Sequence, residues 1–318
     1  MQKFKVRDYL ELLQENELVT SFILPSELLE QEINSISYNS KQVISNTLFV
    51  CKGLGYKKEY LEEAIQKGAI LYLSEHKEES QSDFPHIIVS DVRTALAVIT
   101  CMYYNYPAKR INIIGITGTK GKSTTAYYIK SILDYYLKQQ HQKDTAIISS
   151  IDTYDGVSRE KSKLTCPESL ELQNHIKNAV DSNMPYLVME VSSQALKFSR
   201  THGILYDVGI FTNISEDHIS PTEHPDFEDY FSNKLKFFHQ VKNAIINLDS
   251  DYIGRILSEA NASSSVKRIV TYSTKNNGAD IMAYDIQKEG VSLLKFKLNS
   301  TFEELNGKEI VLTMPRTF

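Results

Sequence analysis

The chain has 318 residues, which is long enough for two domains that each bury a sizeable core. Its 35 lysine and arginine residues and 40 aspartate and glutamate residues give a formal net charge of -5, which argues weakly against a nucleic-acid partner. Charged side chains interrupt every apolar run in residues 1–20, and no stretch approaches the length of a membrane span. The 3 cysteines have no metal-ligand spacing, which fits free thiols in a reducing compartment. We therefore expect a cytoplasmic protein without membrane insertion; nothing in the sequence indicates an oligomeric state.

Short strands and helices alternate in the N-terminal third of the chain. We expect strands at Thr47–Cys51 and His86–Ser90, and a helix at Tyr60–Lys67 that ends at Gly68. Pro107–Arg110 is typical of a linker. We therefore predict an N-terminal α/β domain at residues 1–108 and a second domain at residues 109–318.

The most informative segment is GITGTKGKSTT, Gly115–Thr125. It lies between an expected strand at Ile111–Ile116 and an expected helix at Thr124–Leu137, and such a glycine-rich loop can bind nucleotide phosphates through its backbone N–H groups. The loop departs from the general pattern, whose first glycine would fall on Ile116. A surface turn is the alternative. The residues expected to contact the nucleotide are Gly118, Thr119, Lys120, Gly121, Lys122, Ser123 and Thr124, with Lys122 as the cation and Ser123 as a Mg²⁺ ligand.

The remaining elements predict a mainly parallel α/β sheet. Further strands are expected at Tyr186–Val191, Val208–Thr212 and Asn243–Leu248, with helical stretches between them. A β-rich tail from Asp280 to Leu312 is expected to extend the same domain as antiparallel strands. Ligands of such sheets collect at the carboxyl ends of the strands.

Two side chains at those strand ends are candidates for a metal site. Glu190 ends an apolar strand, and a carboxylate there is costly to bury unless it meets a cation or a metal ion, so we expect a Mg²⁺ ligand. A structural salt bridge is the alternative. His218 follows the next strand; a single histidine is more often structural, but three strand ends would bring Ser123, Glu190 and His218 together.

Lys234 has an unusual position on an expected helix at Phe227–Gln240. The helical period places it inside the apolar stripe, whereas Lys236 lies opposite. Burial lowers the pKa of a lysine, and a neutral amine can react with CO₂ to give a carbamate that binds metal. A lysine that extends to the surface or meets Glu190 is the alternative.

These motifs resemble the Mur ligase family, the ATP-dependent amide-bond ligases of peptidoglycan precursor synthesis, and most closely its MurE-type enzymes. The likeness rests on the loop and on MEVSS at Met189–Ser193, TNISEDH at Thr212–His218 and NKLKFF at Asn233–Phe238. It implies an ATP site that includes Asn213, a carbamylated Lys234, and Mg²⁺ bound by Ser123, Glu190, His218 and Lys234. It also implies catalytic roles for Lys122, His218 and Lys234.

The N-terminal region resembles the uridine-binding element of the MurE-type enzymes. YNSK at Tyr38–Lys41 stands where the family has an Asp-Ser-Arg triplet, so Ser40 carries over while its neighbours differ. TCPE at Thr165–Glu168 resembles a Thr-Thr-Pro-Glu segment that contacts the muramoyl-peptide substrate. The substrate-binding residues implied by the resemblance are Ser40, Thr165, Cys166, Ser192 and Arg200.

The resemblance implies that the amino acid joins UDP-MurNAc-L-Ala-D-Glu through an acyl-phosphate intermediate. L-Lysine or diaminopimelate is the expected class of amino acid, and both partners are small molecules. The family's third, C-terminal domain is not found in the sequence, so we expect the chain alone to bind ligands without turning over. The alternatives are a folylpolyglutamate-type ligase, which lacks a uridine-binding domain, and a non-catalytic nucleotide-binding module.

Overall fold

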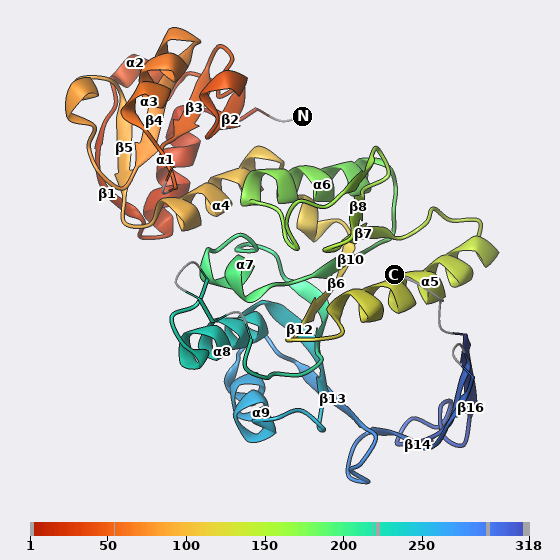
Figure 1. The fold of residues 1–318 in the computed structure, drawn as a ribbon. Coiled ribbons are helices and arrows are strands. Elements are labelled where there is room, and N and C mark those ends of the chain that lie inside the picture. The colour runs from red at the N-terminus through yellow and green to blue at the C-terminus, as the bar shows by residue number, and fades with distance from the viewer. Residues whose placement is uncertain (1–2, 54, 218, 221–222, 291–292, 314–318) are drawn as a thin grey trace. The chain divides into compact units, whose positions relative to one another are not determined.

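The computed structural model describes residues 3–53, 55–217, 219–220, 223–290 and 293–313 (Figure 1). The chain forms two compact units that do not divide it at a single point. The first unit contains Met1–Ile111, Gln142–Leu187 and Ala195–Ile204, and the second contains Asn112–His141, Val188–Gln194 and Leu205–Phe318. Two elements, β10 (Tyr186–Glu190) and α7 (Ser193–Lys197), each cross a boundary between these ranges and are described with the second unit. Among the described residues, no helix combines the length and the apolar character needed to cross a membrane.

The first unit contains a sheet with helices on both faces. Its strand order is β1-β5-β4-β3-β2, with β1 antiparallel to β5 and the other pairs parallel. The strands are β1 (Val19–Ile23), β2 (Ser35–Ser37), β3 (Thr47–Val50), β4 (Ala69–Ser74) and β5 (His86–Val89), and the helices are α1 (Val6–Glu15), α2 (Ser26–Leu29), α3 (Lys58–Gln66) and α4 (Val92–Tyr103). The strands predicted at β3 and β5 and the helix at α3 are confirmed.

Alternation along β3 explains why both faces are covered. Leu48 and Val50 belong to the core formed with α1 and α4, whereas Phe49 and Cys51 belong to the core formed with α3. All four residues of β3 are buried, as expected for a parallel strand covered on two faces.

The rest of the first unit surrounds α6 (Ser169–Asp181), which packs against α4 and η3 (Pro107–Lys109). The segment predicted as a linker therefore forms a short 3₁₀ helix, because Pro107 is buried against α6. Three short antiparallel strands complete this part, β7 (Ala146–Ile148), β8 (Asp152–Tyr154) and β9 (Arg159–Lys161). The remaining 3₁₀ helices of the unit are η1 (Ser40–Gln42) and η2 (Glu79–Gln81).

The second unit is built on a sheet of strand order β16-β15-β14-β13-β12-β11-β6-β10. Pairing is parallel from β6 through β11, β12 and β13 to β14, and antiparallel between β14, β15 and β16. The strands are β6 (Asn112–Thr117), β10 (Tyr186–Glu190), β11 (Tyr206–Phe211), β12 (Val241–Asn247), β13 (Arg268–Ser273), β14 (Ile281–Glu289), β15 (Leu293–Ser300) and β16 (Glu309–Thr313). The predicted mainly parallel sheet and its antiparallel tail are confirmed, with strand ends shifted by one or two residues.

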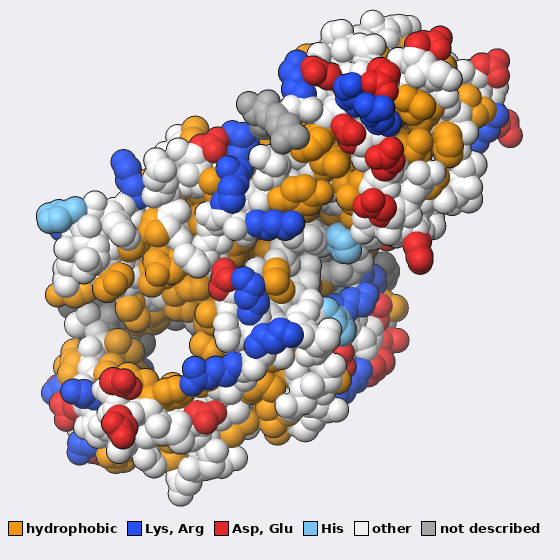
Figure 2. Space-filling model, turned by 180° about the vertical axis from the view of Figure 1, so that it is seen from behind, with side chains coloured by type: hydrophobic (Ala, Val, Ile, Leu, Met, Phe, Trp, Pro, Cys, Tyr) orange, Lys and Arg blue, Asp and Glu red, His pale blue; other side chains and the backbone are white. Residues whose placement is uncertain are grey.

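The helices of the second unit are α5 (Lys122–Gln139), α7 (Ser193–Lys197), α8 (Phe227–Leu235), η4 (Lys236–Gln240) and α9 (Ile253–Ala262). The single helix predicted at Phe227–Gln240 is thus wrong in its second part, which is a 3₁₀ helix. Two consecutive aromatic rings, Phe237 and Phe238, are fully buried there, one against Tyr206 and the other against Phe211. Both signs of charge occur among apolar side chains on the face drawn in Figure 2, in keeping with the nearly balanced composition.

Candidate functional site

The loop between β6 and α5 begins and ends with a glycine at positive φ. Gly118 has a φ of +145°, and a Cβ built on it would lie 1.9 Å from the Thr212 Oγ1 atom. Gly121 has a φ of +83° and caps α5. An L residue is strained in these conformations, and Gly118 also has no room for a side chain. The structure therefore forms the strand, loop and helix that the sequence predicts, and nucleotide binding by the loop stays a prediction.

Gly115 explains why the loop departs from the general phosphate-binding pattern. This residue lies inside β6, and a Cβ on it would come within 2.6 Å of the Tyr206 ring. The first glycine of the segment therefore serves close packing in the sheet, and the loop itself begins at Gly118.

The segment that follows β11 holds the loop in place. The Lys120 N–H donates to Asn213 Oδ1 at 2.9 Å, and Asn213 Nδ2 donates back to the Lys120 carbonyl at 3.0 Å. The Thr212 hydroxyl donates to the same carbonyl at 2.9 Å. Asn213 therefore contacts the loop directly, and its predicted contact with a nucleotide stays a prediction.

Two further loop side chains point in opposite directions. The buried Thr119 hydroxyl lies 2.9 Å from the Tyr230 hydroxyl and accepts a hydrogen bond from the Ser215 N–H at 3.0 Å. The exposed Lys120 forms an ion pair with Asp217 at 2.8 Å. Thr119 thereby joins the loop to α8, while Lys120 joins it to the segment after β11.

Lys122, the first residue of α5, extends back over the loop. Its Nζ donates to the carbonyls of Gly118 and Thr119 at 2.8 and 3.1 Å. Burial lowers the pKa of Lys122, and the negative charges of Glu190 and Asp217 oppose that shift. Ser123 is half-buried and Thr124 is exposed in the same first turn, where the helix N-terminus attracts anions.

Lys234 reaches the same loop from α8. Its side chain is 1% exposed, and Nζ donates to the Gly118 carbonyl at 3.1 Å while lying 4.9 Å from the centre of the Tyr230 ring. Lys236 is exposed. The prediction that Lys234 faces inward is confirmed, and the alternative in which it extends to the surface is wrong.

The environment of Lys234 favours its neutral amine. Burial holds the pKa of Lys234 well below its ordinary value, and the charge of Lys122 lowers it further. Asp217 acts in the opposite direction. A neutral, buried amine is the form that can react with CO₂, so the surroundings fit the predicted carbamate, which itself stays a prediction.

Glu190 and Ser123 supply oxygen atoms of the type that Mg²⁺ prefers. Glu190 ends β10 and is 1% exposed, as predicted. His218, the remaining predicted ligand, lies outside the described residues. Within the described ranges, no group of three or more histidine, cysteine, aspartate or glutamate residues is arranged to hold a metal ion. The predicted set contains one such described residue, so the metal site stays a prediction that rests on its donor chemistry.

Two of the predicted substrate-binding residues, Arg200 and Cys166, lie together in the first unit. The Arg200 Nη1 group donates to the Cys166 carbonyl at 3.4 Å, and Nη2 pairs with Glu168 at 2.7 Å. Lys52 pairs with the other oxygen of Glu168 at 2.6 Å. Within the part of the chain that the structure describes, the buried Arg200 Nε has no hydrogen-bond partner. The guanidinium is therefore held between the Cys166 carbonyl and the Glu168 carboxylate.

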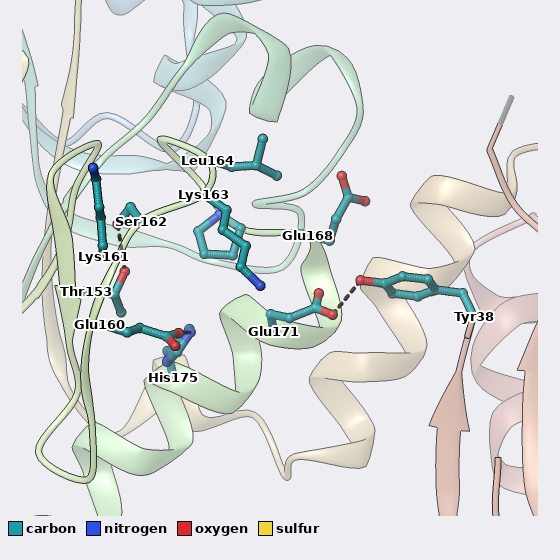
Figure 3. Close-up of a pocket in the computed structure, with 11 residues that line it drawn as sticks. Tyr38, Thr153, Glu160, Lys161, Ser162, Lys163, Leu164, Glu168, Glu171 and His175 are labelled. Atoms are coloured by element: carbon teal, nitrogen blue, oxygen red, sulfur yellow. Dashed lines mark hydrogen bonds and ion pairs between the residues drawn. The ribbon is translucent and has the colours of Figure 1, made fainter. Parts of the chain in front are cut away.

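A cavity of about 320 Å³ lies beside this network (Figure 3). Its volume is at the lower end of the range for small-molecule sites. Lys163 extends from the loop after β9 toward α6, and the Tyr38 hydroxyl donates to Glu171 across the cavity. Lys52 lies 4.1 Å from the centre of the Tyr38 ring. The lining residues are Tyr38, Thr153, Glu160, Lys161, Ser162, Lys163, Leu164, Pro167, Glu168, Glu171 and His175.

A buried carboxylate orients the histidine in this cavity. Asp155 is 1% exposed and accepts hydrogen bonds from His175 Nδ1 at 2.7 Å and from Asn178 Nδ2 at 2.8 Å. Burial raises the pKa of Asp155, but the bond from His175 and further hydrogen bonds outweigh it and leave the pKa below the ordinary value. His175 Nε2 lies 3.7 Å from Glu160.

The other predicted substrate residues lie apart from Arg200 in the sequence. Ser40 is 5% exposed and donates to Glu63 at 2.6 Å, in the first unit. Thr165 is half-buried in the same unit, whereas Ser192 belongs to the second unit. Their contacts with a ligand stay predictions.

The sequence analysis assigned no individual role to several residues of the site. Tyr230 falls on the buried face of α8, which a helical period could have indicated. Thr212, Asp217, Lys52 and Glu168 act through partners far away in the sequence, and only the fold brings these partners close.

The family described as the Mur ligase middle domain matches residues 116–315 of this chain. The chain is 41% identical over 276 residues to a UDP-N-acetylmuramoyl-L-alanyl-D-glutamate–L-lysine ligase of Enterococcus faecalis, covering 84% of this chain and 53% of that protein. It is 38% identical over 265 residues to a UDP-N-acetylmuramyl-tripeptide synthetase of Lactobacillus delbrueckii subsp. bulgaricus, covering 82% of this chain and 50% of that protein. The chain spans about half the length of these curated relatives.

Solved structures share the fold. A UDP-N-acetylmuramoyl-L-alanyl-D-glutamate–2,6-diaminopimelate ligase superposes with a TM-score of 0.78 at 20% identity, over 97% of this chain and 59% of that one. MurF from Acinetobacter baumannii superposes with a TM-score of 0.61 at 17% identity, over 99% of this chain and 61% of that one. The resemblance that the loop and strand-end motifs suggested is confirmed, and the chain belongs to the Mur ligase family.

Proposed function

We propose that this chain supplies the nucleotide and muramoyl-peptide sites of an ATP-dependent ligase that adds an amino acid to UDP-MurNAc-L-Ala-D-Glu. The observation that carries the proposal is the meeting of Lys122 and Lys234 at the Gly118 carbonyl of the loop. A half-buried and a buried amine beside a phosphate-binding loop fit a site for transfer of a highly charged group. The name of the relative at 41% identity supports this substrate and L-lysine as the amino acid, and the name of the relative at 38% identity supports a muramyl tripeptide as the product. L-Lysine or diaminopimelate remains the proposed class of amino acid.

In the proposed reaction, the γ-phosphoryl group of ATP passes to the terminal carboxylate of the muramoyl dipeptide. The amine of the incoming amino acid then attacks this acyl phosphate, an amide bond forms, and phosphate leaves. Lys122 neutralises charge on the transferring group after it releases the loop carbonyls, and the backbone after Gly118 positions the phosphates. Mg²⁺ held by Ser123, Glu190, His218 and a carbamylated Lys234 would supply further charge neutralisation.

The first unit contains the residues proposed for the sugar-nucleotide substrate. We retain residues 1–108 as the domain that binds the uridine diphosphate through Ser40, and residues 109–318 as the domain that binds ATP. The cavity beside Glu168, whose lining includes Lys161 and Lys163, supports an anionic ligand near Thr165 and Cys166. This metabolic role agrees with the expected location in the cytoplasm.

Calorimetric titration tests the substrate. UDP-MurNAc-L-Ala-D-Glu is added to the chain in the presence of Mg²⁺ and a non-hydrolysable ATP analogue, and folate is titrated separately. Saturable binding of the muramoyl nucleotide that Ser40→Ala weakens tenfold or more supports the proposal. Ser45→Ala is the matched control, because Ser45 is an exposed serine in the same segment. Binding of the ATP analogue alone contradicts the substrate, and binding of folate in its place favours a folylpolyglutamate-type ligase.

A further inference from the structure

Three side chains of the second unit form a hydrogen-bonded network that the proposed reaction does not use; Ser193 and His224 are buried in it, and Asp229 is half-buried. His224 is 0% exposed, its Nδ1 lies 2.6 Å from Asp229 Oδ2, and its Nε2 lies 2.9 Å from the Ser193 hydroxyl. Ser193 is 4% exposed. Because a carboxylate accepts hydrogen bonds, Nδ1 carries the proton and Nε2 accepts from Ser193.

The hydrogen bonds between Ser193, His224 and Asp229 connect two elements that carry predicted metal ligands. Ser193 begins α7, three residues after Glu190 at the end of β10. Asp229 lies in the first turn of α8, five residues before Lys234. His224 joins them from the segment between β11 and α8 through its two ring nitrogens.

The surroundings of His224 connect it with the phosphate loop as well. Its ring packs edge-on against Tyr230 at 5.3 Å, and the Tyr230 hydroxyl meets Thr119 of the loop at 2.9 Å. Asn233 Nδ2 donates to the Asp229 carboxylate at 3.1 Å, which further fixes that side chain on α8. A displacement of His224 would therefore shift α8 relative to both the strand end and the loop.

The arrangement resembles a hydrolase triad in its residue types but lacks access for a substrate. A nucleophilic serine must reach a reacting atom, whereas Ser193 and His224 are almost completely buried. A hydrogen-bonded network with a buried histidine at its centre instead fixes the distance between the elements that it joins.

We propose that the Ser193–His224–Asp229 chain is a positioning device that sets the separation of Glu190 and Lys234, and with it the affinity for Mg²⁺ in the nucleotide complex. His224 is thus a positioning residue that acts through the two ends of the chain. This inference rests on the proposed function, because it assumes that Mg²⁺ binds with the nucleotide between those two side chains. Residues that orient metal ligands typically change metal affinity by about 10- to 100-fold when they are replaced.

The experiment measures ADP affinity by calorimetry, first in EDTA and then across a Mg²⁺ titration. In His224→Phe and in the milder Ser193→Ala, we expect the gain in ADP affinity from Mg²⁺ to fall by about tenfold or more, while affinity in EDTA stays within about twofold. Ser232→Ala is the matched control, because this serine of α8 bonds to the exposed Glu228. Asp229→Asn should preserve the gain, because the amide can donate to Nδ1 and the ring can then donate from Nε2 to Ser193.

Nitrogen NMR of His224 supplies a readout that does not depend on the metal. We expect the proton on Nδ1 in the wild type and on Nε2 in Asp229→Asn. An unchanged Mg²⁺ effect in folded Ser193→Ala and His224→Phe would overturn the inference, as would an equal loss of affinity with and without Mg²⁺. If the wild type binds ADP without any gain from Mg²⁺, the inference fails alone. If the wild type binds no ADP at all, the proposed function fails and the inference with it.

Discussion

Replacing Gly118 by alanine tests whether the loop conformation depends on the missing side chain. The new Cβ would lie 1.9 Å from the Thr212 hydroxyl, which is far inside van der Waals contact. The hydroxyl would have to move, and its single hydrogen is shared between the carbonyls of Lys120 at 2.9 Å and Thr117 at 3.2 Å. The substitution therefore adds backbone strain and also disturbs this shared hydrogen bond.

The magnitude follows from these two contributions. A non-glycine residue at such a φ costs about 1–3 kcal/mol, and loss of the one hydroxyl hydrogen bond costs about 0.5–1.5 kcal/mol. We expect Gly118→Ala to lower the free energy of unfolding by about 1.5–4.5 kcal/mol. Gly121→Ala is the matched control, because this glycine also has positive φ but its Cβ would meet nothing within 4 Å. The control should cost only about 1–2 kcal/mol.

Urea denaturation followed by circular dichroism measures the free energy of unfolding of both variants. Calorimetry measures their affinity for ADP, which depends on the conformation of the loop. Gly118→Ala should abolish detectable ADP binding under conditions where Gly121→Ala weakens it. Thr212→Ala in the Gly118→Ala background should recover part of the stability, because it removes the atom that the Cβ meets. Equal unfolding free energies for the two glycine variants would refute the argument from the close contact.

Three further predictions concern Lys234, Glu168 and the thiols. With ¹³C-bicarbonate, the wild type should give a carbamate ¹³C signal that Lys236→Gln retains and Lys234→Gln loses; a signal that survives Lys234→Gln would assign the carbamate elsewhere. Burial raises the pKa of Glu168, but the bond and charge of Lys52 and the charge of Arg200 outweigh it and leave the pKa below the ordinary 4.5. This carboxylate therefore stabilises the fold above about pH 4.5 and loses its effect as the pH falls through the lowered pKa. Glu168→Gln should cost about 1.5–3 kcal/mol at pH 7 and flatten the acid limb of a stability profile, whereas an unchanged limb would contradict this account. The three cysteines are free and buried, and burial raises the pKa of each thiol to about 12. A thiol reagent should therefore label them only after denaturation, and fast labelling of the folded chain would contradict that burial.

The sequence predicted the features that depend on neighbouring residues. The loop, its flanking strand and helix, the buried end of β10 and the inward face of Lys234 all follow from local spacing and periodicity. The helix predicted through Gln240 was too long, because Lys236–Gln240 form a 3₁₀ helix in which the buried Phe237 and Phe238 rings contact two different residues of β11.

Features that depend on distant segments could not be predicted. The pairs of Glu168 with Lys52 and Arg200 join three separated segments, and no periodicity indicates them. The same holds for His224, whose partners are 31 residues before it and 5 residues after it. His224 by itself looks like any surface histidine in a loop, and only its complete burial distinguishes it.

Lys122 occupies the loop that a nucleotide would use, and its amine already holds two carbonyls there. When a phosphate group binds, Lys122 exchanges its hydrogen bonds to these two carbonyls for contacts with the phosphate. The measured affinity for a nucleotide therefore reflects the difference in free energy between these two sets of Lys122 contacts. A substitution that weakens the hydrogen bonds from Lys122 to the loop carbonyls and leaves its charge intact would raise the affinity for phosphate, even though it removes contacts from the free protein.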